Sequence, residues 1–127
     1  MLFSNTKDIK PNITIGINGQ PITCVTKTKF LGVIIDNKLS WKEHISYVCG
    51  KVAKGIGIVS KVRKYLNKST LLELYYSFIY PYLTYCNQVW GLSCKSHMDA
   101  LVKLQKRAIR IISGVHPRTH TDPLFTR

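Results

Sequence analysis

The sequence contains few acidic residues: six Asp and Glu stand against 19 Lys and Arg among 127 residues, which gives a formal net charge of +13. No two of these carboxylates lie within four positions of each other. Two-metal catalysis needs carboxylates that converge on ions about 4 Å apart, so the chain offers little material for such a centre. The Gly-x-Ser-x-Gly elbow and the phosphate-binding Gly-rich loop ending in Lys-Ser/Thr are missing too, and no catalytic residue is predicted. The positive excess instead favours a polyanionic partner.

Long hydrophobic runs are also missing. The longest unbroken apolar stretch is residues 30–35, whereas a helix that crosses a bilayer needs about 20 apolar residues. Polar residues follow Met1, Leu2 and Phe3 at once, which is untypical of a secretory leader. These absences predict a soluble, intracellular protein without a membrane partner, and an apolar content of 45% predicts a globular fold.

The four cysteines, at positions 24, 49, 86 and 94, have no close paired spacing. In a reducing compartment this pattern predicts buried thiols. Cys94-x-x-His97 and His116-x-x-x-His120 contain ligand types at spacings that zinc accepts, and Cys86 is a substitute ligand. Because a Cys-x-x-Cys pair or a complete finger is missing, a zinc module stays the weaker alternative and no metal site is predicted.

The first 36 residues have the pattern of β-structure. Alternation over residues 13–17, the pair Asn18-Gly19 and residues 21–25 predict a hairpin, because both central turn residues must adopt positive φ. Residues 29–35 predict a third strand, and their almost wholly apolar character predicts that both of its faces are covered. The predicted fold class is therefore α+β: a short antiparallel hairpin or three-stranded sheet, followed by a bundle of three helices.

The first predicted helix covers residues 40–66 and opens with a Ser40–Glu43 capping-box pair. Apolar residues recur along it at steps of three and four, which places them on one face. These residues are Trp41, Ile45, Val48, Val52, Ile56, Val59, Val62 and Leu66. Glycines at positions 50, 55 and 57 predict a bend or break in this helix.

The second predicted helix begins near residues 67–70, where Thr70 and Glu73 form another capping-box pair. It is apolar on almost all sides, which predicts that it is buried, and Pro81 must end or kink it before residues 82–90 continue. The third helix covers residues 96–113 and is followed by Gly114 as a C-cap. The predicted domains are a β-rich part at 1–38, a helical part at 39–114 and an irregular tail at 115–127.

Two of these helices carry basic residues on the side opposite their apolar faces. They are Lys54, Lys61 and Lys64 on the first helix, and Lys103, Lys106, Arg107 and Arg110 on the third. Ordinary exposed helix faces mix charges of both signs, whereas residues 44–68 contain no acid at all. These seven residues are therefore predicted to contact nucleic-acid phosphates, each contact adding about −0.9 to the slope of log affinity against log salt on a duplex.

Short segments occur along the chain in a specific order. They are KFLGVIID at 29–36, LSW at 39–41 with HI at 44–45, LY at 74–75 with IYPYLTY at 79–85, VWG at 89–91, LQKRAIRIISG at 104–114 and THTDPLF at 119–125. The ordered set resembles the end of the reverse transcriptase of non-LTR, LINE-type, jockey-like retrotransposons. Even MLFS at residues 1–4 resembles a palm segment that lies a little upstream in that family.

The resemblance implies roles for two parts of the chain. The segment around Lys29, Phe30, Leu31 and Gly32 is expected to form a β-hairpin that supports the primer terminus. The helices after it are expected to form the thumb, whose basic faces follow the phosphates of the template–primer, an RNA–DNA hybrid or duplex. The expected location is a nuclear or cytoplasmic ribonucleoprotein.

The chain departs from this family at the catalytic centre. The family holds two Mg²⁺ ions with an aromatic-x-Asp-Asp motif and another upstream Asp, and no Asp-Asp pair occurs here. The resemblance therefore implies a segment of an RNA-directed DNA polymerase without its own catalytic residues or cofactor, whose missing partners are the catalytic palm and fingers. No small-molecule site is evident. A stand-alone nucleic-acid-binding module, and a protein-interaction module that packs residues 70–90 on a partner, stay open as alternatives.

Overall fold

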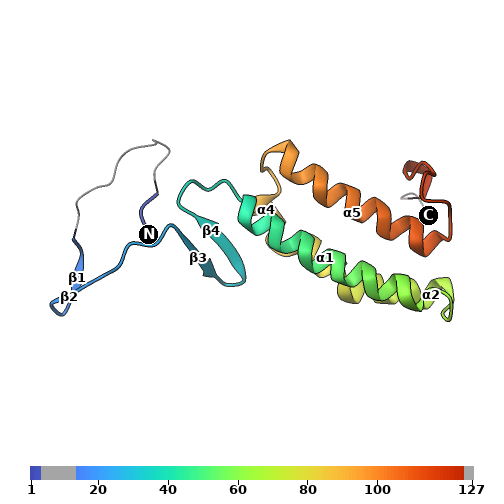
Figure 1. The fold of residues 1–127 in the computed structure, drawn as a ribbon, viewed down its shortest axis with the longest axis horizontal. Coiled ribbons are helices and arrows are strands. Elements are labelled where there is room, and N and C mark those ends of the chain that lie inside the picture. Colours follow the sequence, from blue (N-terminus) through green and yellow to red (C-terminus); the bar gives the residue numbers. More distant parts are fainter. Residues whose placement is uncertain (4–13, 125–127) are drawn as a thin grey trace. The chain divides into compact units, whose positions relative to one another are not determined.

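The computed structural model describes residues 1–3 and 14–124, and the chain divides into two compact units, residues 1–44 and 45–127 (Figure 1). The first unit contains strands and the second contains helices, which confirms the predicted α+β class. The predicted limits at 38 and 114 concern family domains and stay predictions. No helix among the described residues is long and apolar enough to span a bilayer.

The first hairpin joins β1 (Gly16–Ile17) and β2 (Gln20–Pro21), which pair antiparallel. Asn18 and Gly19 form its turn with φ values of 51° and 79°, as the sequence predicts. The strands are only two residues long, and their side chains are exposed because no other described strand pairs with or covers them. The start of the predicted first strand, Ile13, lies outside the described residues.

The predicted third strand is wrong. Residues 29–35 instead belong to a second hairpin, in which β3 (Lys27–Phe30) pairs antiparallel with β4 (Val33–Asp36). Leu31 and Gly32 make the turn with φ values of 45° and 83°, a conformation that glycine adopts without strain. The two hairpins form separate two-stranded sheets, and Phe30 and Leu31 are 62% and 74% exposed rather than covered.

Asp36 orders the chain between β4 and α1 (Lys42–Val62). Its carboxylate accepts hydrogen bonds from the Lys38 N–H at 2.9 Å, from the Ser40 N–H and hydroxyl at 3.1 and 3.0 Å, and from the Trp41 N–H at 3.1 Å. The fixed turn accommodates a positive φ of 61° at Trp41, which a bulky residue adopts only when its surroundings impose it. Glu43, predicted to cap the helix, has its carboxylate 3.6 Å from Lys27 Nζ.

Helix α1 is continuous over 21 residues, so the predicted break at its glycines is wrong. The predicted apolar face is confirmed in its central part, where five residues are buried: Ile45, Val48, Val52, Ile56 and Val59. Gly55 is buried in this face, and a Cβ added there would lie 2.8 Å from Ile79 Cγ1 and 3.0 Å from the Phe78 carbonyl oxygen. Glycine at position 55 therefore lets α1 approach the chain at the end of the second helix closely.

The second helical region consists of α2 (Lys68–Phe78), α3 (Tyr80–Thr84) and α4 (Asn87–Trp90). Asn67 caps α2 by accepting a hydrogen bond from the Thr70 N–H at 2.9 Å, so Thr70 lies within the first turn and the predicted Thr70–Glu73 cap is wrong. The predicted interruption at Pro81 is confirmed, because α2 ends before Ile79 and α3 begins at Tyr80.

The predicted burial of this region on all sides is wrong. Its buried residues are Leu71, Tyr75, Ile79 and Trp90, whereas seven large apolar residues are exposed. The exposed ones are Leu72, Tyr76, Phe78, Tyr80, Tyr82, Tyr85 and Val89. Their exposure follows from the small number of neighbours: among the described residues, the other helices of this unit cover only one side of α2.

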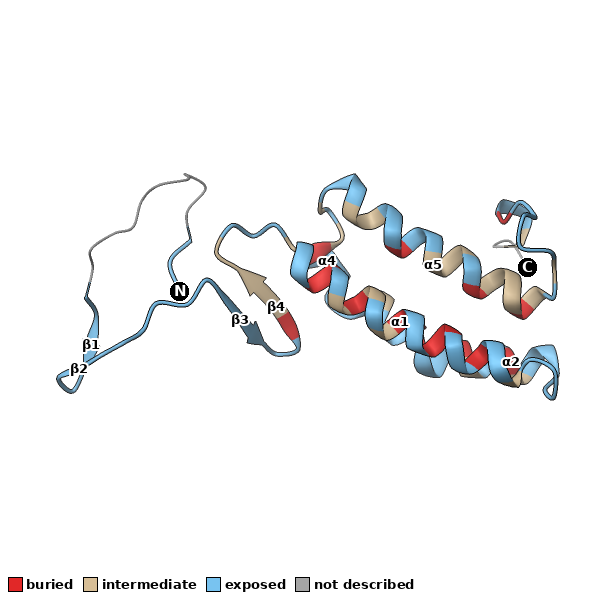
Figure 2. Cartoon of the chain, viewed as in Figure 1, coloured by how far each residue is buried: buried red, intermediate tan, exposed pale blue. Residues whose placement is uncertain are grey.

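Helix α5 (Lys95–Ser113) completes the bundle, and its buried residues Leu101, Ala108 and Ile112 recur at steps of seven and four (Figure 2). Gly114 ends it with a φ of 67° and donates its N–H to the Arg110 and Ile111 carbonyls, which confirms the predicted C-cap. A short 3-10 turn, η1 (Asp122–Leu124), contacts α5. The prediction of buried cysteines is wrong, because Cys49 is half-buried and the other three are exposed.

Candidate nucleic-acid interface

A basic hollow lies where the end of α1 meets the C-terminal half of α5. Arg63 lines it from the α1 side, and Arg107 and Arg110 line it from α5. Its volume is about 790 Å³, within the range of about 300–1,000 Å³ typical of ligand-binding clefts. The other lining residues are Ser60, Ile111, Gly114, Val115, His116 and Pro117, so the described wall contains no carboxylate.

Each arginine is positioned by local backbone structure. Arg63 immediately follows α1, and its N–H still donates to the Val59 carbonyl at 3.0 Å, which fixes its backbone at the helix end. Arg107 and Arg110 are three residues apart on α5 and therefore neighbours on one face. The Nε of Arg110 also donates to the Thr119 carbonyl at 2.9 Å, so part of this side chain is held in place.

The structure separates the other predicted basic residues from the hollow. Lys54 and Lys61 are exposed on α1, and their positions on the helix lie opposite its buried stripe. Lys64 lies in the turn after α1, so it does not extend that helical face. On α5, Lys103 is exposed, and Lys106 Nζ lies 3.9 Å from Asp122 Oδ1. Only two of the seven predicted residues thus line the hollow.

Arg63 is the site residue that the sequence reasoning missed. It lies seven positions after Ile56, so on a helix of 3.6 residues per turn it falls on the same side as that buried residue. The sequence signal for Arg63 is its position on the apolar side of a helix, close to the predicted end of that helix. A charged side chain at such a position must extend past the neighbouring helix to reach water or an anion.

The predicted primer-contacting residues lie at the tip of the β3–β4 hairpin. Lys29 and Phe30 end β3, and Leu31 and Gly32 make the turn. The hairpin that the resemblance implies is therefore present, and its tip exposes an aromatic and an aliphatic side chain. A role at a primer terminus stays a prediction.

Two titratable groups support this hairpin within the first unit. His44 Nδ1 accepts a hydrogen bond from the Ile34 N–H at 3.2 Å, which ties β4 to the first turn of α1, and burial lowers the pKa of this histidine. Burial raises the pKa of Asp36, but hydrogen bonds from Ser40, Lys38 and Trp41 outweigh it, so the net pKa is lowered. The two shifts therefore favour the neutral imidazole of His44 and the ionised carboxylate of Asp36.

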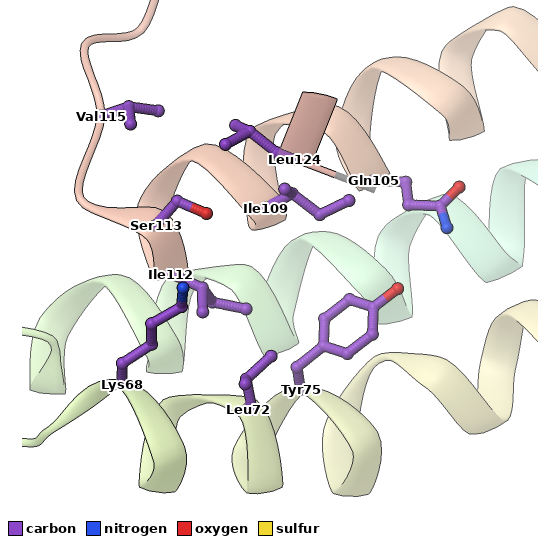
Figure 3. A pocket seen from close by; sticks show the side chains of 9 residues that line it. All are labelled: Lys68, Leu72, Tyr75, Gln105, Ile109, Ile112, Ser113, Val115 and Leu124. Atoms are coloured by element: carbon purple, nitrogen blue, oxygen red, sulfur yellow. The ribbon is translucent and has the colours of Figure 1, made fainter. Parts of the chain in front are cut away.

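A second pocket, between α2 and α5, is mainly apolar (Figure 3). Its volume is about 380 Å³, and its lining residues are Lys68, Leu72, Tyr75, Gln105, Ile109, Ile112, Ser113, Val115 and Leu124. Burial raises the pKa of Tyr75, although a hydrogen bond with Gln105 opposes this. The sequence predicts no small-molecule site. This apolar pocket has no sequence signal because its lining residues are far apart in the chain.

The zinc alternative gains no support from the geometry. Within residues 1–3 and 14–124, no three side chains of His, Cys, Asp or Glu gather as a metal site would require. Cys94 Sγ lies 3.3 Å from Ser96 Oγ, and this hydrogen bond lowers the pKa of the Cys94 thiol.

Comparison with known proteins identifies relatives over most of the chain. It is 32% identical over 98 residues, 74% of its length, to the probable RNA-directed DNA polymerase from transposon X-element of Drosophila melanogaster. It is also 31% identical over 116 residues, 88% of its length, to the RNA-directed DNA polymerase from mobile element jockey of the same species. The chain belongs to the jockey-like RNA-directed DNA polymerase family.

The similarity to the jockey-like family concerns a short part of each relative. The jockey protein of Drosophila funebris is 30% identical over 115 residues, and the chain spans 11–12% of the length of these relatives. No family model and no solved structure matches the chain.

Proposed function

We propose that this chain is the segment of a jockey-like RNA-directed DNA polymerase that grips the template–primer. The helical unit acts as a thumb on the phosphates of an RNA–DNA hybrid, and the β3–β4 hairpin lies at the primer terminus. The chain supplies no catalytic residue; the catalytic aspartates, the Mg²⁺ ions and the palm and fingers belong to the rest of such a polymerase. It would act in a nuclear or cytoplasmic ribonucleoprotein.

The observation that carries this proposal is the basic hollow, where Arg63, Arg107 and Arg110 line one concave surface without a carboxylate. Phosphate oxygens are the natural partners of guanidinium groups, which can offer two parallel N–H donors to one phosphate. Contacts of this kind fix a protein on nucleic acid and carry no direct information about base sequence. Binding should therefore depend strongly on salt and only weakly on sequence.

The hairpin tip supports the second part of the proposal. Phe30 and Leu31 are exposed at a turn, and Lys29 adds a positive charge beside them. An aromatic side chain can stack on the end of a base-paired stem, since every base presents a π-face. The tip thus offers apolar contact to a terminal base pair, with a cation for the adjacent backbone.

Fluorescence anisotropy of a labelled RNA–DNA hybrid at about 50 and 200 mM salt tests the proposal. Each phosphate that the arginines neutralise contributes about −0.9 to the slope of log affinity against log salt, so this fourfold rise in salt weakens binding by about 3.5-fold for each phosphate held in the hollow. The triple variant R63Q/R107Q/R110Q should lose most of that slope.

The variant K54Q/K61Q/K64Q is the matched control, because it removes the same number of charges outside the hollow. Equal losses in the two triple variants would show that the hollow is not the seat of binding. A wild-type chain that does not bind the hybrid at low salt would refute the proposed function.

A protein-interaction module is the second candidate, and the exposed apolar side of α2 and α3 favours it. Tyr76 and Tyr80 are 58% and 44% exposed and have their ring centroids 5.3 Å apart, with Leu72 one turn before them. Apolar surface of this kind marks interaction sites or aggregation-prone faces. Size-exclusion chromatography of the purified chain tests this function, and a clean monomer at high concentration would contradict it.

A further inference from the structure

We infer that the basic hollow is a discrete phosphate-binding site, in which Arg63 from α1 and the pair Arg107 and Arg110 from α5 clamp a single phosphate group from opposite walls. The inference rests on the proposed function and makes it specific. The inference is that the hollow binds one phosphate at a defined site, in contrast to a basic surface that attracts nucleic acid non-specifically.

The choice of cation in the hollow is the first argument. Among the described residues, three of the four arginines line it and none of the 12 lysines does, although lysine is far more abundant there. The guanidinium group is more weakly hydrated than an ammonium and presents its donors in a planar fork. Arginine is therefore the better residue for a concave site that receives a phosphate, and lysine suits the open faces of α1 and α5.

The charge balance of the hollow is the second argument. Three permanent positive charges share one surface, and the described ion pairs of Glu43 and Asp122 are with Lys27, Lys106 and His120. Hence, in the described part of the chain, no recorded ion pair with a carboxylate relieves the repulsion among the three arginines. A bound phosphate, with its charge and several acceptor oxygens, would relieve it and satisfy several N–H donors at once.

Preorganisation is the third argument. The Nε of Arg110 donates to the Thr119 carbonyl, which holds the side chain, and among the described residues its terminal N–H groups have no recorded partner. The left-handed turn at Gly114 brings Val115, His116 and Pro117 back to close the end of the hollow. A site that is already formed loses less conformational entropy when its ligand binds.

Inorganic phosphate is the simplest probe of this site, because it shares its oxygens with a nucleic-acid backbone. The full chain is titrated with phosphate at constant ionic strength, with chloride as the reference salt, by calorimetry and by thermal unfolding. The expected results are saturable binding, a rise of Tm in phosphate that is larger in the wild-type chain than in R63Q, and displacement of a labelled RNA–DNA hybrid by phosphate.

Single variants locate the site. R63Q and R107Q should each weaken phosphate binding at least tenfold, and R107K should also weaken it because it keeps the charge but loses the fork. K95Q removes one exposed charge at the start of α5, outside the hollow, and should leave phosphate binding unchanged. Arg63 and Arg107 are exposed, so these variants should keep the fold, which far-UV circular dichroism checks directly.

The outcomes separate the inference from the proposed function. Hybrid binding without saturable phosphate binding would overturn the discrete site and leave the proposed function standing. Phosphate binding without hybrid binding would refute the proposed function and identify free phosphate as the ligand. Loss in R107Q but not in R63Q would overturn the clamp between opposite walls, and so would phosphate that binds without displacing the hybrid.

Discussion

Gly55 permits the close approach of α1 to the end of α2, and replacing it with alanine tests whether that approach is real. The added Cβ would lie 2.8 Å from Ile79 Cγ1 and 3.0 Å from the Phe78 carbonyl oxygen. Ile79 is fully buried and the Phe78 oxygen belongs to the backbone, so neither atom can move without shifting a helix or its neighbours.

Gly57 provides the matched control two positions later. A Cβ at Gly57 meets nothing within 4 Å, so G57A should show only the gain in helix propensity, about 1 kcal/mol. G55A receives the same gain but adds the cost of overpacking, about 1–3 kcal/mol. The difference in unfolding free energy between the two variants therefore isolates the close contact and should be about 1–3 kcal/mol, with G57A the more stable.

Thermal and urea unfolding followed by circular dichroism measure this difference. For a helical unit of this size, about 1 kcal/mol corresponds to a Tm shift of about 4–8 °C, so the two variants should be clearly resolved. Equal stability of G55A and G57A would refute the close packing of α1 against residues 78 and 79. A G57A variant less stable than wild type would instead refute the continuous, exposed helix at that position.

Three further perturbations test the caps and the buried histidine. Replacing Asp36 with Asn weakens the acceptor of the turn before α1, which should cost about 1–3 kcal/mol and speed hydrogen exchange at the Trp41 amide; unchanged exchange would contradict the turn. N67A should cost about 1 kcal/mol in thermal unfolding, whereas N67D should keep most of the cap; equal Tm values would argue against the cap. Burial lowers the pKa of His44 from 6.5, so its stabilising contribution is complete above pH 6.5 and is lost as the pH falls below that value. The protection factor of the Ile34 amide should therefore fall between about pH 7 and 5. The pKa of Asp36 is lowered from 3.8, so the stability that Asp36 contributes is lost only as the pH falls below 3.8. A change in Ile34 protection above pH 5 therefore comes from His44. Protection of Ile34 that stays constant down to pH 5 would refute this role of His44.

Periodicity predicted the helices that have one buried stripe. The apolar steps of three and four from Ile45 to Val59 gave the buried face of α1, and Gly114 marked the end of α5. Both signals are local, because a helix repeats every 3.6 residues and a left-handed C-cap favours glycine whatever lies around it. The predicted break at the glycines of α1 was wrong because helix propensity counts only the intrinsic cost of glycine in a helix. It does not count the close packing at position 55, which leaves no room for a side chain.

The site was only partly accessible from the sequence. Spacing identified Arg107 and Arg110 as neighbours on one helix face, which the structure confirms. It could not join them to Arg63, which is more than 40 positions away and is brought near them by the packing of α1 and α5. Helical periodicity says which side of one helix a residue occupies, and it carries no information about which helix lies opposite.

The two failed burial predictions have one physical cause. The runs around Phe30 and Tyr76 were expected to be buried because they are apolar on nearly all sides, and the structure leaves both partly exposed. Apolar composition indicates how much of a segment's surface would be stabilised by burial. The number of neighbouring elements decides how much of that surface is actually buried. Within the described residues those neighbours cover one side only. Under the proposed function the hairpin tip meets a primer end, so the exposure of Phe30 is expected of a segment that works against another surface.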